Sequence, residues 1–172
     1  MTSFGISEYA LDVERRKGMP LAIQKILVPG TGLPVPDAEE ADRRLNISVV
    51  FTSIESTLAA LREAGSLASS LGARVTLLVP QVVRYPLPLE TPPVSIEFSE
   101  KRFREIVSKS PVETSVHIYL CRDKLPTLIS VLKPGSIVVL GGRKGRWWLT
   151  SDEILANALR RAGYEVIFRE AE

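Results

Sequence analysis

The clearest indication of fold in this chain is the stretch Ser136-Ile137-Val138-Val139-Leu140-Gly141-Gly142-Arg143-Lys144-Gly145. Its apolar, β-branched first half predicts a buried parallel strand. The glycines behind it open a loop toward a helix that begins near Thr150. Backbone N–H groups and the helix dipole favour an anion at such a helix start, so this is where a phosphate would be held.

From Leu45 onward, short apolar runs alternate with segments of helical spacing. The runs predict strands at residues 47–51, 75–79, 116–120, 137–140 and 164–168. Asp123 is a predicted helix N-cap, and Thr150 with Glu153 forms a capping-box pattern. This alternation is typical of an α/β fold, a doubly wound, mostly parallel five-stranded sheet with helices on both faces.

The first 44 residues differ in composition from the rest. They are rich in proline and glycine and end in a charged run, so we divide the chain into an N-terminal extension, residues 1–44, and a domain, residues 45–172. Lys25-Ile26-Leu27-Val28 has the pattern of one short strand. We favour a linker with an apolar anchor here over an added edge strand, which could also pair across a dimer.

Composition excludes several classes of protein. The 22 basic and 20 acidic residues nearly balance, so bulk charge indicates neither a nucleic-acid nor a membrane partner. The single cysteine, Cys121, excludes an intrachain disulfide and a cysteine-based zinc cluster. No apolar run approaches the roughly 20 residues of a membrane span, and the N-terminus lacks a signal-peptide pattern. We therefore expect a cytoplasmic protein with no transmembrane segment.

Ligands of doubly wound proteins lie beyond the carboxyl ends of the strands, where the strand order reverses. If the first and fourth predicted strands are neighbours, the loops after Phe51 and Leu140 meet at that point. Both loops are polar or glycine-rich, as a binding site would require.

Residues 45–172 resemble the universal stress protein family. The resemblance lies in Ile47 to Thr52 followed by Ser53-Ile54-Glu55-Ser56, in Pro134-Gly135-Ser136 with the Gly141-Gly142 and Gly145 loop, and in the closing Leu149-Thr150-Ser151 helix and strand. It implies a doubly wound domain, often dimeric, and in some members ATP binding. The order of elements contributes more to it than any one motif, because Gly-x-x-Gly is common.

The chain departs from the ATP-binding pattern of that family at three points. Thr52 stands where an acidic residue is expected, and only four residues separate Gly145 from Thr150 where the pattern has a longer spacer. The glycine expected before the hydroxyl residue is also missing. A short loop offers fewer backbone donors to a phosphate, so the predicted phosphate loop is partly eroded.

The resemblance assigns a candidate nucleotide site, with ATP and Mg²⁺ as the candidate ligand or no cofactor at all. Its members are Thr52, Ser53, Val79, Gly142, Arg143, Gly145, Thr150 and Ser151. Two interpretations stay open for the glycines, a phosphate cradle or a tight strand-to-helix turn. The hydroxyls of Thr150 and Ser151 are either phosphate donors or parts of a helix cap.

Arg146, Trp147 and Trp148 form a candidate interaction loop. Cationic and stacking groups would suit nucleic acid, an anionic lipid or a phosphate. We favour a solvated basic loop whose tryptophans pack on the domain or on a dimer mate, and we predict that at least one tryptophan is buried. Nucleic acid is the less favoured partner.

No metal, nucleophile or general-base motif is found in the sequence. His117 and Cys121 are interpreted as sheet residues, with a redox-sensitive thiol as the less favoured alternative for Cys121. We therefore predict a non-enzymatic binding or regulatory module in stress adaptation, with slow hydrolysis of bound ATP left open. The resemblance further implies a homodimer through the edge strand at residues 164–168. The alternative is an interaction module without nucleotide, associated with a protein partner such as a transporter.

Overall fold

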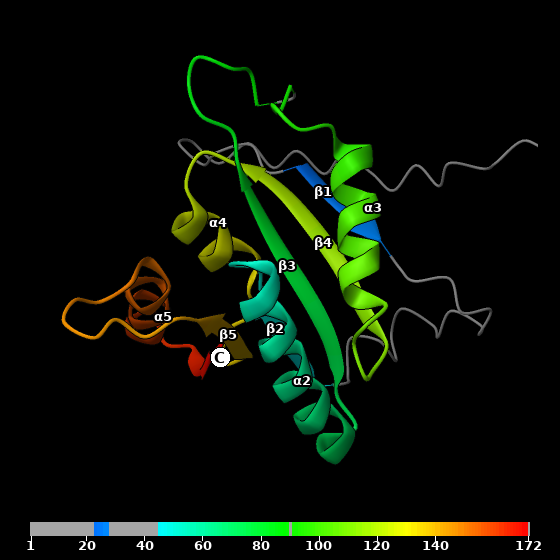
Figure 1. Ribbon diagram of the computed structural model, residues 1–172, viewed down its shortest axis with the longest axis vertical. Coiled ribbons are helices and arrows are strands. Elements are labelled where there is room, and N and C mark those ends of the chain that lie inside the picture. The colour runs from blue at the N-terminus through cyan, green and yellow to red at the C-terminus, as the bar shows by residue number, and fades with distance from the viewer. Residues whose placement is uncertain (1–22, 28–44, 90, 172) are drawn as a thin grey trace, which may run out of the picture.

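A computed structural model describes residues 23–27, 45–89 and 91–171 (Figure 1). Six strands and four helices follow one another in these residues. They are β1 (Ile23–Leu27), β2 (Asn46–Val50), α2 (Ile54–Leu71), β3 (Arg74–Val82), α3 (Ile96–Val107), β4 (Thr114–Cys121), α4 (Lys124–Val131), β5 (Ile137–Gly142), α5 (Ser151–Arg161) and β6 (Glu165–Glu170).

The strands form one sheet in the order β1-β4-β3-β2-β5-β6. Strands β2 to β6 are parallel to one another, and in β2 Ile47 lies opposite Val75 on one side and Ile137 on the other. The predicted doubly wound, mostly parallel five-stranded sheet is confirmed. The order reverses between β2 and β5, so the condition under which the loops after Phe51 and Leu140 meet is fulfilled.

The preference for a linker at residues 25–28 was wrong. Strand β1 pairs antiparallel with β4 at the edge of the sheet, in a register that places Lys25 opposite Ile118. An unpaired outer edge on β4 would present a row of free N–H and C=O groups, and β1 satisfies them. The rest of the extension, including Val28, lies outside the described residues, so the division of the chain at residue 44 stays a prediction.

Two apolar cores lie on the two faces of the sheet. In Figure 1, α2 and α3 lie over the front of the strands, with α4 and α5 on the other side. Leu61 of α2 and Phe103 of α3 pack on the first face, and Leu128 of α4 and Leu159 of α5 pack on the second. Because helices cover both faces of the sheet, the loops lie at the ends of the strands.

Side-chain caps fix the starts of the helices that border those loops. Ser53 caps α2, Ser95 caps α3, and Asp123 caps α4 as predicted. Helix α5 begins at the predicted capping box, in which Thr150 Oγ1 accepts from the Glu153 N–H at 3.3 Å. None of the described helices is both long and apolar enough to cross a bilayer.

Candidate functional site

A cleft of about 660 Å³ opens where β2 and β5 end side by side. Its lining comes from the end of β2, the first turn of α2, α3, and the β5–α5 connection. The lining residues are Phe51, Thr52, Ser53, Ile54, Glu55, Ser56, Arg102, Arg143, Thr150 and Asp152. The cleft therefore lies at the topological switch point, where doubly wound proteins hold ligands.

Thr52, in the lining of the cleft, forms hydrogen bonds to two neighbouring elements. Its hydroxyl donates to the Gly141 carbonyl oxygen at 2.7 Å, and its N–H donates to Thr57 Oγ1 at 3.3 Å. These contacts tie the end of β2 to β5 and to α2. Thr52 thus has a structural task at the position where the resembled family carries an acidic residue.

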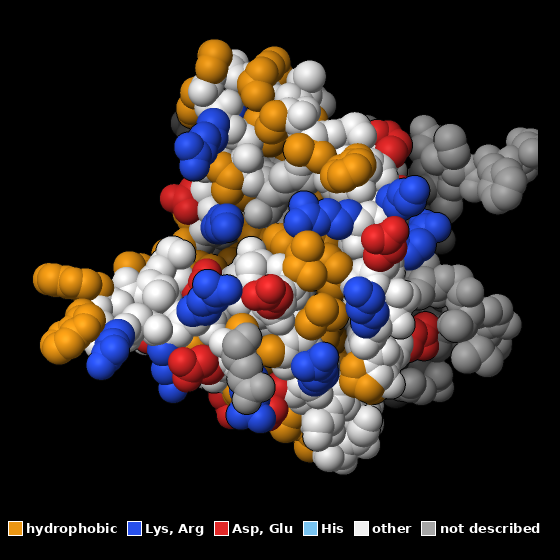
Figure 2. All heavy atoms as spheres, in the orientation of Figure 1, with side chains coloured by type: hydrophobic (Ala, Val, Ile, Leu, Met, Phe, Trp, Pro, Cys, Tyr) orange, Lys and Arg blue, Asp and Glu red, His pale blue; other side chains and the backbone are white. Residues whose placement is uncertain are grey.

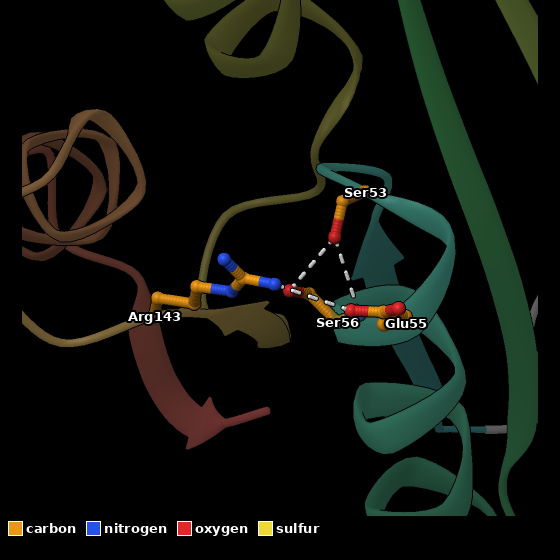
Figure 3. Close-up of polar contacts among 4 residues, drawn as sticks. All are labelled: Ser53, Glu55, Ser56 and Arg143. Atoms are coloured by element: carbon orange, nitrogen blue, oxygen red, sulfur yellow. Dashed lines mark hydrogen bonds and ion pairs between the residues drawn. The ribbon is translucent and has the colours of Figure 1, made fainter. Parts of the chain in front are cut away.

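The first turn of α2 presents polar groups to the cleft (Figure 3). Ser53 Oγ accepts from the Ser56 N–H at 3.3 Å and donates to Ser56 Oγ at 2.9 Å. Arg143, just past the end of β5, reaches across to Glu55 with a separation of 3.4 Å between Nη2 and Oε2. Both side chains are more than 70% exposed, at 78% and 72%, so this ion pair is weak and exchangeable.

Close packing between elements explains why β5 ends in two glycines, without any ligand. A Cβ on Gly141 would overlap the backbone carbonyl of Ser56, where α2 approaches β5. A Cβ on Gly142 would come within 2.7 Å of Asp152 Cβ and of the Phe168 ring. Neither has a positive φ; among the residues that the structure describes, only Gly72, Gly135 and Gly163 do. These positions require glycine for close approach between elements.

The phosphate position predicted at the start of α5 is occupied by a side chain of the protein itself. Glu153 Oε2 accepts from the Thr150 N–H at 2.8 Å, the Gly145 N–H at 3.1 Å and Thr150 Oγ1 at 3.2 Å. The backbone donors of Thr150 and then Gly145 lower the pKa of the Glu153 carboxyl. An internal carboxylate therefore fills the anion site that the helix start creates.

Asp152, next to Glu153, faces the cleft instead. Partial burial raises the pKa of this carboxyl, against a smaller opposite effect of Lys124. A second, smaller cavity of about 230 Å³ adjoins it between α4 and α5. Asp152 and Thr52 border both cavities, and Ser151 borders the smaller one. Asp152 adds negative charge to a cleft in which an anion would have to lie.

The structure brings together half of the candidate nucleotide residues. Thr52, Ser53, Arg143 and Thr150 line the large cleft. Val79 is buried in the core beneath α2, 2% exposed, and lines neither cavity. Gly142 is buried at the end of β5, Gly145 is exposed in the loop that follows, and neither lines a cavity.

Sequence reasoning missed Arg102. This exposed residue of α3 lines the cleft together with Arg143, although more than 40 positions separate the two in the chain. No local motif marks it, because its place follows from α3 packing on the same face of the sheet as α2.

Neither tryptophan packs on the domain. We predicted that at least one tryptophan is buried against the domain or a dimer mate; Trp147 is 84% exposed and Trp148 is 87% exposed, which contradicts packing on the domain. The loop is too short to fold back: a Cβ on Gly145 would overlap the Trp148 carbonyl, which marks a tight turn that points the side chains outward. Burial against a dimer mate stays a prediction.

His117 and Cys121 are sheet residues of β4, as interpreted from the sequence. His117 Nδ1 lies 3.3 Å from the Tyr119 hydroxyl, and burial lowers its pKa. Burial raises the pKa of the Cys121 thiol, which disfavours the reactive thiolate. In the described part of the chain, no three His, Cys, Asp or Glu side chains are grouped to hold a metal ion.

No protein-family model matches this chain, and no curated protein matches it. Several solved structures resemble it, and three of them each have 15% sequence identity to this chain. A universal stress protein from Archaeoglobus fulgidus gives a TM-score of 0.48 over 72% of this chain and 92% of its own. A universal stress protein in complex with cAMP gives 0.47, over 75% and 98%, and the Archaeoglobus fulgidus protein in complex with dAMP gives 0.43, over 73% and 96%. These three solved structures that this chain resembles are universal stress proteins, while its doubly wound fold rests on the strand order described above.

Proposed function

We propose that this domain is a non-catalytic binding module of the universal stress protein type, and that its cleft takes an adenine nucleotide with one phosphate. The observation that carries the proposal is the composition of the cleft wall. Phe51 and Ile54 form an apolar side, Ser53 and Thr150 supply hydroxyls, and Arg102 and Arg143 supply positive charge. Adenine is the base that the family resemblance implies.

The size of the cleft suits such a ligand. Small-molecule sites usually enclose about 300–1,000 Å³ with apolar walls and a few convergent polar groups. The cleft volume of about 660 Å³ lies within that range. A phosphate between Arg102 and Arg143 would replace Glu55 as the partner of Arg143, an exchange that costs little because the ion pair is exposed.

A triphosphate fits this cleft less well. Glu153 already takes the N–H groups of Gly145 and Thr150, which would otherwise reach the terminal phosphates. Glu55 and Asp152 add two carboxylates against the two arginines of the lining, so the wall has no excess positive charge. We therefore infer that ATP with Mg²⁺ binds no more tightly than the monophosphate.

Calorimetric titration of the full chain with AMP tests the proposal, with GMP and adenosine as matched ligands. We expect AMP to bind, and Arg102→Ala to weaken it about tenfold through loss of a charge-assisted hydrogen bond. Arg104→Ala is the matched control, because Arg104 is an exposed arginine of the same helix that does not line the cleft. The absence of AMP binding up to millimolar ligand would refute the proposal.

The second candidate function is an interaction module without any nucleotide. The occupied anion site at the start of α5 favours it, because that site is complete without a ligand. In this form the predicted homodimer would pair β6 with its copy, since β6 is an edge strand of the sheet. A monomeric mass in light scattering at micromolar concentration would exclude the dimer.

A further inference from the structure

The β5–α5 connection ends in an exposed apolar tip with basic neighbours. Trp147, Trp148 and Leu149 are 84%, 87% and 61% exposed, and Ile154 in the first turn of α5 is 57% exposed. Figure 2 shows hydrophobic side chains standing out from the body at the side of the molecule where Figure 1 places this loop, with Lys and Arg side chains beside them. Such a tip is costly to leave in water.

Hydrogen bonds join the loop before α5 to the first turn of that helix. Glu153 holds the Gly145 N–H, and Thr150 Oγ1 donates to the Arg143 carbonyl oxygen at 2.9 Å. The close approach of the Trp148 carbonyl to Gly145 leaves no room for a side chain in the turn. The backbone that carries the two indole rings is therefore held in place, which lowers the ordering cost of any contact they make.

The charges around the tip favour an anionic partner. In the part of the chain that the structure describes, the side chains of Arg143 and Lys144 form only exposed ion pairs, with Glu55 at 3.4 Å and Glu170 at 3.8 Å. Within the described residues, Arg146 makes no ion pair or hydrogen bond, and it directly precedes the tryptophans. Three basic residues thus flank two aromatic ones.

We propose that residues 143–149 are a membrane-surface anchor that inserts Trp147 and Trp148 into the headgroup region of an anionic bilayer. Tryptophan prefers the membrane–water interface, where its ring lies among apolar groups and its N–H stays hydrated. A projecting tip enters a fluid interface without a matching groove, which a protein partner would need. Arg146 contributes by attraction to anionic lipid. The anchor does not depend on a nucleotide in the cleft.

Tryptophan fluorescence of the full chain reports on this loop alone, because Trp147 and Trp148 are the only tryptophans in the sequence. The probes are vesicles of phosphatidylcholine and vesicles that also contain phosphatidylserine. We expect a blue shift, protection from acrylamide and flotation with the anionic vesicles, and binding to the neutral ones at least about tenfold weaker.

Two variants and two controls separate the anchor from a general surface effect. The double variant Trp147→Ala/Trp148→Ala should lose flotation, and Arg146→Glu should weaken it at least about fivefold while keeping the fluorescent reporters. Phe98→Ala and Arg62→Glu change an exposed aromatic and an exposed charge elsewhere, and both should bind like the wild type.

Three results would overturn the proposal. The first is no flotation with anionic vesicles, and the second is wild-type flotation by both loop variants. The third is a blue shift that appears without vesicles, either with rising protein concentration or with single-stranded RNA, because the loop would then contact a second copy or a nucleic acid.

Discussion

Helices α2 and α5 both begin at the same edge of the sheet, but the polar groups at their first turns have different surroundings. Helix α2 is capped by Ser53, and its first turn lines the cleft. Helix α5 is capped by Thr150 and further closed by Glu153, whose carboxylate takes the donors of the preceding loop. A glycine loop before a helix start is therefore an anion site only when no side chain of the protein fills it.

The same contrast appears within a single turn of α5. Asp152 and Glu153 are neighbours, but burial raises the pKa of Asp152 while hydrogen bonds from Thr150 and Gly145 lower the pKa of Glu153. The Asp152 carboxyl borders the cleft, and the Glu153 carboxylate accepts hydrogen bonds from the loop before α5. Their titrations therefore report on the two halves of the site separately.

The largest expected effect concerns the approach of α2 to β5. Gly141→Ala should destabilise the fold by about 3 kcal/mol, because the new Cβ meets the backbone carbonyl of Ser56. Gly72→Ala is the control: its position has open space and a φ of 63°, so only the strain of about 1 kcal/mol is expected. Urea unfolding measures both, and equal losses would show that close packing does not explain Gly141.

Removing either N-cap should lower the free energy of unfolding by about the same amount, but the two substitutions should affect different parts of the structure. Ser53→Ala and Thr150→Ala should each lose about 1 kcal/mol in urea unfolding. Only Thr150→Ala should speed hydrogen exchange at the Gly145 amide, because Thr150 also holds the Arg143 carbonyl at the base of the loop. Faster exchange at Gly145 in Ser53→Ala would mean that the two helix starts are coupled.

Glu153, at the start of α5, should make the stability of the fold depend on pH in acid. Because its pKa is lower in the folded state than the usual 4.5, Glu153 stabilises the fold above pH 4.5 and loses that effect as the pH falls through the folded pKa. Glu153→Gln should therefore be less stable than the wild type at neutral pH, and the gap should close in acid. Thermal unfolding at a series of pH values measures it, and a gap independent of pH would contradict the assignment.

Asp152 should show a smaller effect of opposite sign. Its pKa is raised above the usual 3.8, so the ionised form costs stability at neutral pH, and the cost disappears below that value. Asp152→Asn should be slightly more stable than the wild type near pH 7 and equal to it in acid. The same series of thermal unfolding curves checks this, and a variant less stable at neutral pH would show that the charge favours the helix start instead.

Much of the fold follows from local pattern. The apolar run at residues 137–140 and the cap residues Asp123 and Thr150 predicted β5, α4 and α5, because buried strands and helix starts have local chemical requirements. The pairing of β2 with β5 entered the sequence analysis only as a condition, because the connection rules of α/β sheets limit the strand order without fixing it. Strand β1 did not follow, because a five-residue strand is specified by the edge that it pairs with.

The site was harder to predict than the fold. The Thr150–Glu153 pattern predicted a capping box, but not that the same carboxylate reaches Gly145, which depends on how the loop turns back. Arg102 enters the cleft through helix packing, a long-range property. The exposure of Trp147 and Trp148 depends on a turn too tight for them to fold onto the domain.

The competition between Glu153 and a phosphate is best measured by calorimetric titration of the wild type and Glu153→Gln with AMP and with ATP and Mg²⁺. Glutamine still closes a capping box, so the variant keeps the helix start and loses only the charge. We predict that the wild type binds ATP no more tightly than AMP, and that Glu153→Gln binds ATP about tenfold more tightly with AMP unchanged. Tight ATP binding by the wild type, unaffected by the substitution, would contradict the occupied anion site.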